Sequence, residues 1–238
     1  MAEIHPSVVL GPGVIVEDDV CIGEGCKIGA YTIIKGPTKI GVNNTFSSHV
    51  VIGDDPQDLK YNGGGKLSIG SGNTFREFTT IHRGHLTEAG TVIGDNNQIL
   101  VGAHVGHDCT IGDGNFLANQ ILLAGHVVMG DFVNMSGNAG SHQFCRIGSY
   151  AMISGLSGIR QDVPPYAMVQ GDPARICGIN TIGLKRQGWD KEMLFKLREA
   201  FRLFRQKDFD GSIDNEYLQE LKLFKEKSDR GLIKFARR

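Results

Sequence analysis

The residues best suited to chemistry in this 238-residue chain are two histidines in a glycine-rich stretch. His104 and His107 lie three positions apart within residues 102–112, and Asp108 directly follows the second histidine. Imidazole takes up and returns a proton near neutral pH, so a histidine here could act as a general base. The competing explanation is that both are polar residues at the corners of a repeat. The elements that position them decide between the two.

The composition argues against several functional classes. Lysine and arginine number 25 against 26 aspartate and glutamate, so we expect no general attraction to nucleic acid or to a membrane surface. No apolar run approaches the roughly 18 residues of a membrane span, and no secretory signal is visible. The five cysteines form no Cys-x-x-Cys pair. We therefore expect a cytoplasmic protein with no disulfide framework, no structural zinc and no stable membrane insertion.

A six-residue repeat of large apolar residues occupies most of the chain. It covers residues 4–52, changes phase, and continues over residues 69–159 with interruptions at Thr87 and Ser141. A period of six fits neither an α-helix, with about 3.6 residues per turn, nor a simple alternating strand. It predicts short strands joined by corners, with three strands closing a coil of about 18 residues around an apolar interior.

The phase change marks a predicted loop insertion at about residues 53–68. This segment is rich in turn-forming residues and carries the polar side chains of Asp58 and Lys60. A loop that leaves a rigid scaffold is a usual place for recognition residues. We therefore expect this loop to take part in binding.

The end of the chain has a different pattern. We expect residues 1–172 to form the prism and residues 173–238 to form a small α-helical domain. Apolar spacing predicts one helix after Asp190 and a second over residues 215–227. This domain carries 16 lysines and arginines against 10 acidic residues. The excess is consistent with docking of an acidic partner and also with an ordinary solvated helix surface.

Seven segments resemble, in order, one known family. They are residues 57–61, 80–84, 103–109, 123–127, 141–145, 161–166 and 183–186. Together they are similar to the UDP-N-acetylglucosamine O-acyltransferases that begin lipid A synthesis in Gram-negative bacteria. The resemblance implies a left-handed parallel β-helix and a homotrimer with active sites between neighbouring prisms. It also implies a 3-hydroxyacyl donor on the phosphopantetheine of acyl carrier protein, the glucosamine 3-hydroxyl of UDP-N-acetylglucosamine as acceptor, and no metal or other cofactor.

The resemblance also implies roles for individual residues. His107 would be the general base, Asp108 could orient it, and the backbone N–H of Gly125 would donate to the thioester oxygen. Gly155 would set the acyl length, and its missing side chain favours a chain of about C14 rather than C10. The implied substrate-binding residues are Asp58, Lys60, His104, His126, His142, Gln143, Asn180 and Arg186. For His142, a structural hydrogen bond is as good an explanation as substrate contact.

The repeat itself favours His107 over His104 as the base. One coil of about 18 residues separates positions 107 and 125, so His107 and Gly125 are expected to stack on successive coils. His104 is offset from this column by three residues.

Some features leave other functions open. Gln187 stands where family members commonly carry a second arginine, so one expected diphosphate contact is lost or replaced. The same base could serve an N-acyltransferase that acts on a UDP-linked 3-amino sugar or another nucleotide amino sugar. A zinc-dependent or non-catalytic prism is a further alternative, with His104, His107 and His126 as the zinc ligands.

Overall fold

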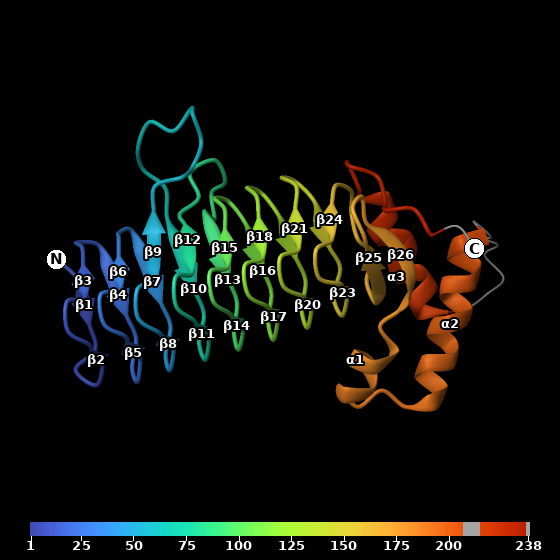
Figure 1. Ribbon diagram of the computed structural model, residues 1–238, viewed down its shortest axis with the longest axis horizontal. Helices are drawn as coiled ribbons and strands as arrows, with labels where there is room; N and C mark the ends of the chain where they lie inside the picture. The colour runs from blue at the N-terminus through green and yellow to red at the C-terminus, as the bar shows by residue number, and fades with distance from the viewer. Residues whose placement is uncertain (207–214, 237–238) are drawn as a thin grey trace.

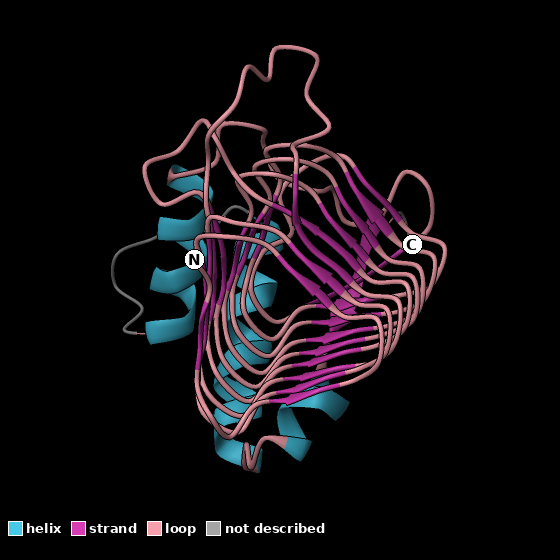
Figure 2. Cartoon of the chain, turned by 90° about the vertical axis from the view of Figure 1, so that its left-hand side faces the viewer, coloured by secondary structure: helices cyan, strands magenta, loops and turns pink. Residues whose placement is uncertain are grey.

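The structure describes residues 1–206 and 215–236, which form a prism of short strands with helices at one end (Figure 1). In this computed structural model the strands build three sheets, here named A, B and C, and all neighbouring strands are parallel except the last pair. Figure 2, turned so that the N-terminal end faces the reader, shows the coils stacked behind one another. The predicted parallel β-helix with a helical C-terminal region is confirmed.

The three sheets take their strands in turn along the chain. Sheet A contains β1 (Glu3–Ile4), β4 (Val20–Ile22), β7 (Thr38–Ile40), β10 (Leu67–Ile69), β13 (Thr91–Ile93), β16 (Thr110–Ile111), β19 (Val128–Met129) and β22 (Arg146–Ile147). Sheet B contains β2 (Val9–Leu10), β5 (Lys27–Ile28), β8 (Thr45–Phe46), β11 (Thr74–Phe75), β14 (Gln98–Ile99), β17 (Phe116–Leu117), β20 (Asn134–Met135), β23 (Met152–Ile153), β25 (Ala167–Gln170) and β26 (Arg175–Ile179). Sheet C contains β3 (Ile15–Val16), β6 (Ile33–Ile34), β9 (Val51–Asp54), β12 (Thr80–His82), β15 (His104–Val105), β18 (Leu122–Leu123), β21 (Gly140–Ser141) and β24 (Gly158–Ile159).

The apolar repeat fills the interior of the prism. In its regular part, strand partners lie one coil apart along the chain, so Val105 pairs with Leu123 and Ile111 pairs with Met129. These four side chains point inward and are almost fully buried. Burial of such a side chain stabilises the fold by about 1.5–3 kcal/mol, which is why a six-residue period specifies this architecture. Ser141 occupies a true inward position, opposite Leu123.

Two loops leave the prism between sheets C and A. Ile69 pairs with Ile40, 29 positions earlier instead of 18, so the first loop adds 11 residues to its coil (Figure 1). Ile93 pairs with Ile69, 24 positions earlier, so residues 83–90 form a second loop with six added residues. The sequence-based placement of Thr87 at an interrupted inward position is therefore wrong. Six added residues equal one repeat, and they leave the phase of the pattern unchanged.

The C-terminal region begins where the parallel coils end. β26 turns back antiparallel to β25, and three helices follow: α1 (Thr181–Arg186), α2 (Lys191–Gln206) and α3 (Glu216–Glu226). Asp190 accepts a hydrogen bond from the Met193 N–H at 2.8 Å, so α2 begins as predicted, and Asn215 caps α3. α1 was not predicted. No helix in the described residues is long and apolar enough to cross a membrane.

A column of buried asparagines ties successive coils together at the corner between sheets A and B. Asn44, Asn73, Asn97 and Asn115 are each at most 1% exposed. The Oδ1 atom of each asparagine accepts the backbone N–H of the next column member, and Asn115 accepts from Val133 in this way, at 2.7–2.9 Å. The column keeps the coils in register at one edge of sheet A, and both loops leave the prism at the other edge of that sheet.

Replacing Asn97 by alanine should lower the free energy of unfolding by about 1–3 kcal/mol, because the N–H of Asn115 and the carbonyl of Gly112 lose buried partners. Denaturant unfolding at fixed protein concentration measures the change. Gln98→Ala, at the exposed neighbouring position, serves as the matched control. Equal unfolding midpoints for the two variants would show that the column does not stabilise the prism.

Candidate active site

The two adjacent residues His107 and Asp108 meet through their side chains. His107 Nδ1 lies 2.8 Å from Asp108 Oδ2. Adjacent residues on a strand usually point to opposite faces, but Asp108 occupies a corner with a φ of 57°, which turns its side chain toward its neighbour. An ionised carboxylate can only accept, so Nδ1 carries the proton. The Nε2 atom of neutral His107 is then free to take up a proton.

Asp108 also organises the second loop. Its carboxylate accepts the backbone N–H groups of His85, Leu86 and Thr87 at 3.2, 2.9 and 2.8 Å, and the Thr87 hydroxyl at 3.0 Å. The residue is only 4% exposed. Burial by itself raises the pKa of Asp108, but the hydrogen bonds from His107 and from these backbone groups outweigh it and hold the pKa well below its usual range. A fixed negative charge therefore lies behind His107.

Gly125 stacks on His107, as the separation of the two positions by one 18-residue coil predicted. A Cβ atom at position 125 would lie 2.6 Å from His107 Nε2, so only glycine leaves room for the ring. Within the described part of the chain, the N–H of Gly125 donates to no other protein group. A proton acceptor and an unused hydrogen-bond donor thus lie side by side.

These two residues open into a groove of about 560 Å³ along the outer face of sheet C. The predicted residues His104, His142 and Gln143 also line it. Burial, reinforced by nearby His82, lowers the pKa of His104 to about 4. His104 is therefore a weaker base than an ordinary imidazole. His142 is exposed, and its Nδ1 lies 3.3 Å from the Gln143 carbonyl.

His126 lies at the next corner in the column above Asp108. Its ring stacks on Phe144 with centroids 4.5 Å apart and meets the His107 ring edge-on at 5.1 Å. Burial lowers the pKa of His126. The neutral form of this ring is therefore favoured, and it lies against the His107 ring.

The first loop lies over the same region, and its base is held by Arg83. This guanidinium donates to the carbonyls of Gly36, Gly53 and Gly64, to the Tyr61 hydroxyl and to the Asp55 carboxylate. Such a set of contacts fixes where the loop leaves the prism.

Asp58 in this loop comes close to a residue that sequence reasoning missed. Asp58 Oδ2 lies 3.2 Å from His85 Nε2, and the His85 ring centroid lies 5.6 Å from that of His107. Lys60 is exposed, and its backbone N–H donates to Asp58 Oδ1. His85 follows one of the segments that carry the family resemblance. Because the six added residues of the second loop leave the repeat unchanged, the sequence did not indicate that His85 lies near His107.

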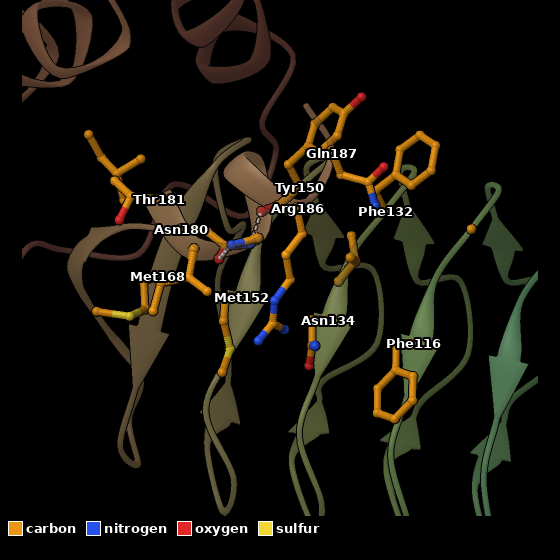
Figure 3. Close-up of a pocket in the computed structure, with 15 residues that line it drawn as sticks. Phe116, Phe132, Asn134, Tyr150, Met152, Met168, Asn180, Thr181, Arg186 and Gln187 are labelled. Carbon is orange, nitrogen blue, oxygen red and sulfur yellow. Dashed lines mark hydrogen bonds between the residues drawn. The ribbon is translucent and has the colours of Figure 1, made fainter. Parts of the chain in front are cut away.

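The remaining predicted residues lie on another face of the prism. Arg186 points into a pocket of about 690 Å³ over sheet B, which Phe116, Met152 and Met168 also line (Figure 3). Asn180 lines this pocket, but both of its polar atoms are engaged. Its Oδ1 accepts from the Gly183 N–H at 3.0 Å and its Nδ2 donates to the Tyr150 carbonyl at 2.8 Å, so it caps α1 (Figure 3). A single chain does not bring Asn180 and Arg186 to His107.

Gly155 lies exposed at the corner between β23 and β24 and lines neither pocket. A Cβ atom there would come within 3.2 Å of the Gly137 carbonyl oxygen, one coil earlier. Gln187 lies at the pocket that holds Arg186 (Figure 3).

Among the described residues, one group has the spacing to hold a metal ion: His85, His107 and Asp108, whose candidate ligand atoms lie within 4.8 Å of one another. The set named from the sequence, with His104 and His126, does not come together in this way. The two oxygens of Asp108 already accept five donors, and a carboxylate offers about four lone-pair sites. The donor chemistry therefore does not favour a metal at this position.

The chain matches two family models. Residues 162–236 match the second domain of UDP-N-acetylglucosamine O-acyltransferase, and residues 1–36 and 90–120 match the bacterial transferase hexapeptide repeat.

Solved structures of similar proteins cover nearly the whole chain. The UDP-N-acetylglucosamine acyltransferase of Francisella novicida is 34% identical, with a TM-score of 0.90 over 98% of this chain and 90% of that one. The enzyme of Campylobacter jejuni is 35% identical, with a TM-score of 0.86 over 99% and 98% of the two chains. That of Bacteroides fragilis is 34% identical, with a TM-score of 0.87 over 98% of each.

Asp108→Asn should destabilise the protein by about 1–3 kcal/mol at pH 7, because an amide cannot accept all five hydrogen bonds. The folded pKa of Asp108 is lowered, so its contribution is complete above the unfolded pKa of about 4 and is lost as the pH falls below it. The stability gap between wild type and variant should therefore narrow below about pH 4. Urea unfolding across pH measures this gap. Glu88→Gln, in the exposed part of the same loop, is the control, and a gap independent of pH would contradict the assignment.

Proposed function

Because the chain belongs to the UDP-N-acetylglucosamine acyltransferase family of lipid A biosynthesis, we propose that it carries out O-acyl transfer. In this proposal a 3-hydroxyacyl chain passes from acyl carrier protein to the 3-hydroxyl of UDP-N-acetylglucosamine. The observation that supports it most directly is the pairing of His107 Nε2 with Gly125 on adjacent coils, because one supplies a base and the other a donor for an oxyanion.

The reaction is assigned to these groups as follows. His107 Nε2 takes the proton of the sugar hydroxyl as its oxygen attacks the thioester carbonyl carbon, and the new C–O bond forms. The negative charge that develops on the carbonyl oxygen is stabilised by the N–H of Gly125. Asp108 stabilises the imidazolium. When the C–S bond breaks, the proton on Nε2 passes to the phosphopantetheine sulfur, and the base is restored.

The groove residues are assigned to the acceptor sugar. His104 and Gln143 would bind the sugar and its N-acetyl group, and His142 would contact the substrate. His126, whose ring lies against that of His107, would contact the sugar or its phosphates. Because burial keeps His104 neutral at pH 7, it can donate or accept a hydrogen bond without introducing a charge.

The first loop carries two further assigned binding groups. The Asp58 carboxylate would accept a hydrogen bond from a substrate hydroxyl, and the exposed Lys60 would donate to one.

Gly155, at the corner between β23 and β24, would leave room for the end of a long acyl chain.

Assembly as a homotrimer would complete the site. Arg186, in α1, lines the pocket over sheet B, and His107 lines the groove on sheet C, so a three-fold arrangement of B faces against C faces would bring them together. The outward side chains Phe116 on sheet B and Leu122 on sheet C are 41% and 55% exposed in the single chain and would be covered by such contacts. Arg186 would then bind the diphosphate, and Gln187 would replace a charged contact with a neutral one.

The proposed donor protein fits the helical end of the chain. Three arginines, Arg198, Arg202 and Arg205, line a groove of about 620 Å³ between β26 and α2. An acidic acyl carrier protein would be attracted to this surface.

Purified protein given UDP-N-acetylglucosamine and a 3-hydroxyacyl carrier protein should form the 3-O-acyl product. His107→Ala should lower kcat on the order of a hundredfold or more through loss of the base, with the oligomer intact by light scattering. His5→Ala, at an exposed position in the first coil, is the control. Near-normal turnover of His107→Ala would remove its assigned role, and a preference of about a hundredfold for the 3-amino acceptor would establish N-acylation instead.

Mixed oligomers test whether the site is shared between subunits. His107→Ala and Arg186→Ala should each be poorly active alone. Unfolded together and refolded at equal ratio, they should recover activity, because random assembly leaves both residues intact at about a quarter of the interfaces. Light scattering confirms that both variants assemble. No recovery in assembled mixed oligomers would contradict the shared site.

A further inference from the structure

His85 occupies an unusual place between the two loops and the base. It belongs to the second loop, yet its side chain is only 6% exposed. Its Nε2 lies 3.2 Å from Asp58 Oδ2, and the ring meets Tyr61 edge-on with centroids 5.1 Å apart. Its backbone N–H donates to Asp108. One residue thus contacts the carboxylate of the first loop and the carboxylate that orients His107.

The Asp58 carboxylate makes few other hydrogen bonds. Its Oδ1 accepts the backbone N–H of Lys60, which is a local turn within the same loop. In the part of the chain that the structure describes, His85 is the one side chain that joins this carboxylate to the body of the protein. The rest of the loop is held separately through Arg83, which donates to the Gly53 and Gly64 carbonyls and to the Tyr61 hydroxyl. Loss of the His85 side chain would therefore free Asp58 without releasing the whole loop.

The direction of the hydrogen bond between His85 and Asp58 follows from the charge on the carboxylate. An ionised carboxylate only accepts, so His85 Nε2 carries a proton and donates it to Asp58. The N–H of Lys60 and this bond from His85 together overcome the effect of burial and lower the pKa of Asp58. Asp58 thus remains an acceptor, with capacity left for a hydroxyl donor.

We propose that His85 is a positioning residue that fixes the Asp58 carboxylate beside His107, where it receives a hydroxyl group of the substrate. This inference rests on the proposed acyl transfer. The hydroxyl belongs either to the 3-hydroxyacyl chain or to the sugar, since both offer the same O–H donor.

Two substitutions separate the hydrogen bond from simple occupancy of the space. In His85→Gln the side-chain amide can present an N–H where Nε2 was, whereas in His85→Asn the amide reaches only to the position of Nδ1. His85→Asn should lower kcat/KM about tenfold, as loss of a hydrogen bond to a charged group does, and His85→Gln should retain most of the activity. In the Asp58→Asn background, His85→Asn should cause little further loss, because the two residues act as a pair.

The substrate identifies the hydroxyl. If it belongs to the acyl chain, the difference between the Asn and Gln variants should vanish with an unhydroxylated acyl donor of equal length. If it belongs to the sugar, the difference should persist with both donors and raise the KM for UDP-N-acetylglucosamine. Either result supports positioning. Equal kcat/KM for the two variants with both donors would overturn it.

Hydrogen–deuterium exchange of residues 57–61 in the protein without substrate gives a readout that needs no turnover. Exchange should be faster in His85→Asn than in wild type or His85→Gln. If wild type transfers no acyl group, the proposed function fails, and the exchange comparison still tests the contact. If wild type is active but the two variants match it in both exchange and kcat/KM, the role of His85 alone is wrong.

Discussion

Each regular coil must return to the same corner after 18 residues, because its backbone groups bond to those of the coils on either side. The relative positions of the candidate site residues on the regular coils depend on this constraint. It places Gly125 directly against His107, and it sets His126 and Phe144 in one column with Asp108. Side chains distant in sequence are thereby held at fixed separations by backbone hydrogen bonds. Such a scaffold supports the preorganisation that electrostatic catalysis requires.

Two loops bring further groups to His107 at the corner where the constraint is relaxed. Both loops leave the prism between sheets C and A, and Asp108 holds one of them through backbone donors while it binds His107. The same carboxylate therefore folds a loop and orients an imidazole. Arg83 holds the first loop in a similar way, by donating to the carbonyls of Gly36 and Gly53. The charges that hold these loops are compensated by hydrogen bonds, which limits the cost of burying them.

The sequence predicted the prism and the stacking of positions 107 and 125 because the six-residue apolar period runs through most of the chain and indicates a solenoid. The loop at residues 83–90 showed in the sequence only as an interruption of the apolar repeat at Thr87, because an insertion of six residues preserves the period. Thr87 was consequently misplaced and His85 carried no signal, whereas the 11-residue insertion changed the phase and was visible. α1 is too short for helical periodicity to show, so the capping role of Asn180 was missed. The contact between His107 and Asp108 depends on a corner dihedral angle that composition does not encode.

The buried asparagine column bears on how the chain avoids misassembly. Coils built from similar apolar repeats could pair with the wrong neighbour during folding, because the inward side chains of successive coils are nearly interchangeable. Asn44, Asn73, Asn97 and Asn115 occur only in four successive coils, and Val133 continues their column. A coil that skipped its partner would leave buried amides facing apolar side chains, at considerable cost. The column thus distinguishes the coils beside the two loops, where an error of pairing would separate His107 from Gly125 and from the loop residues around it.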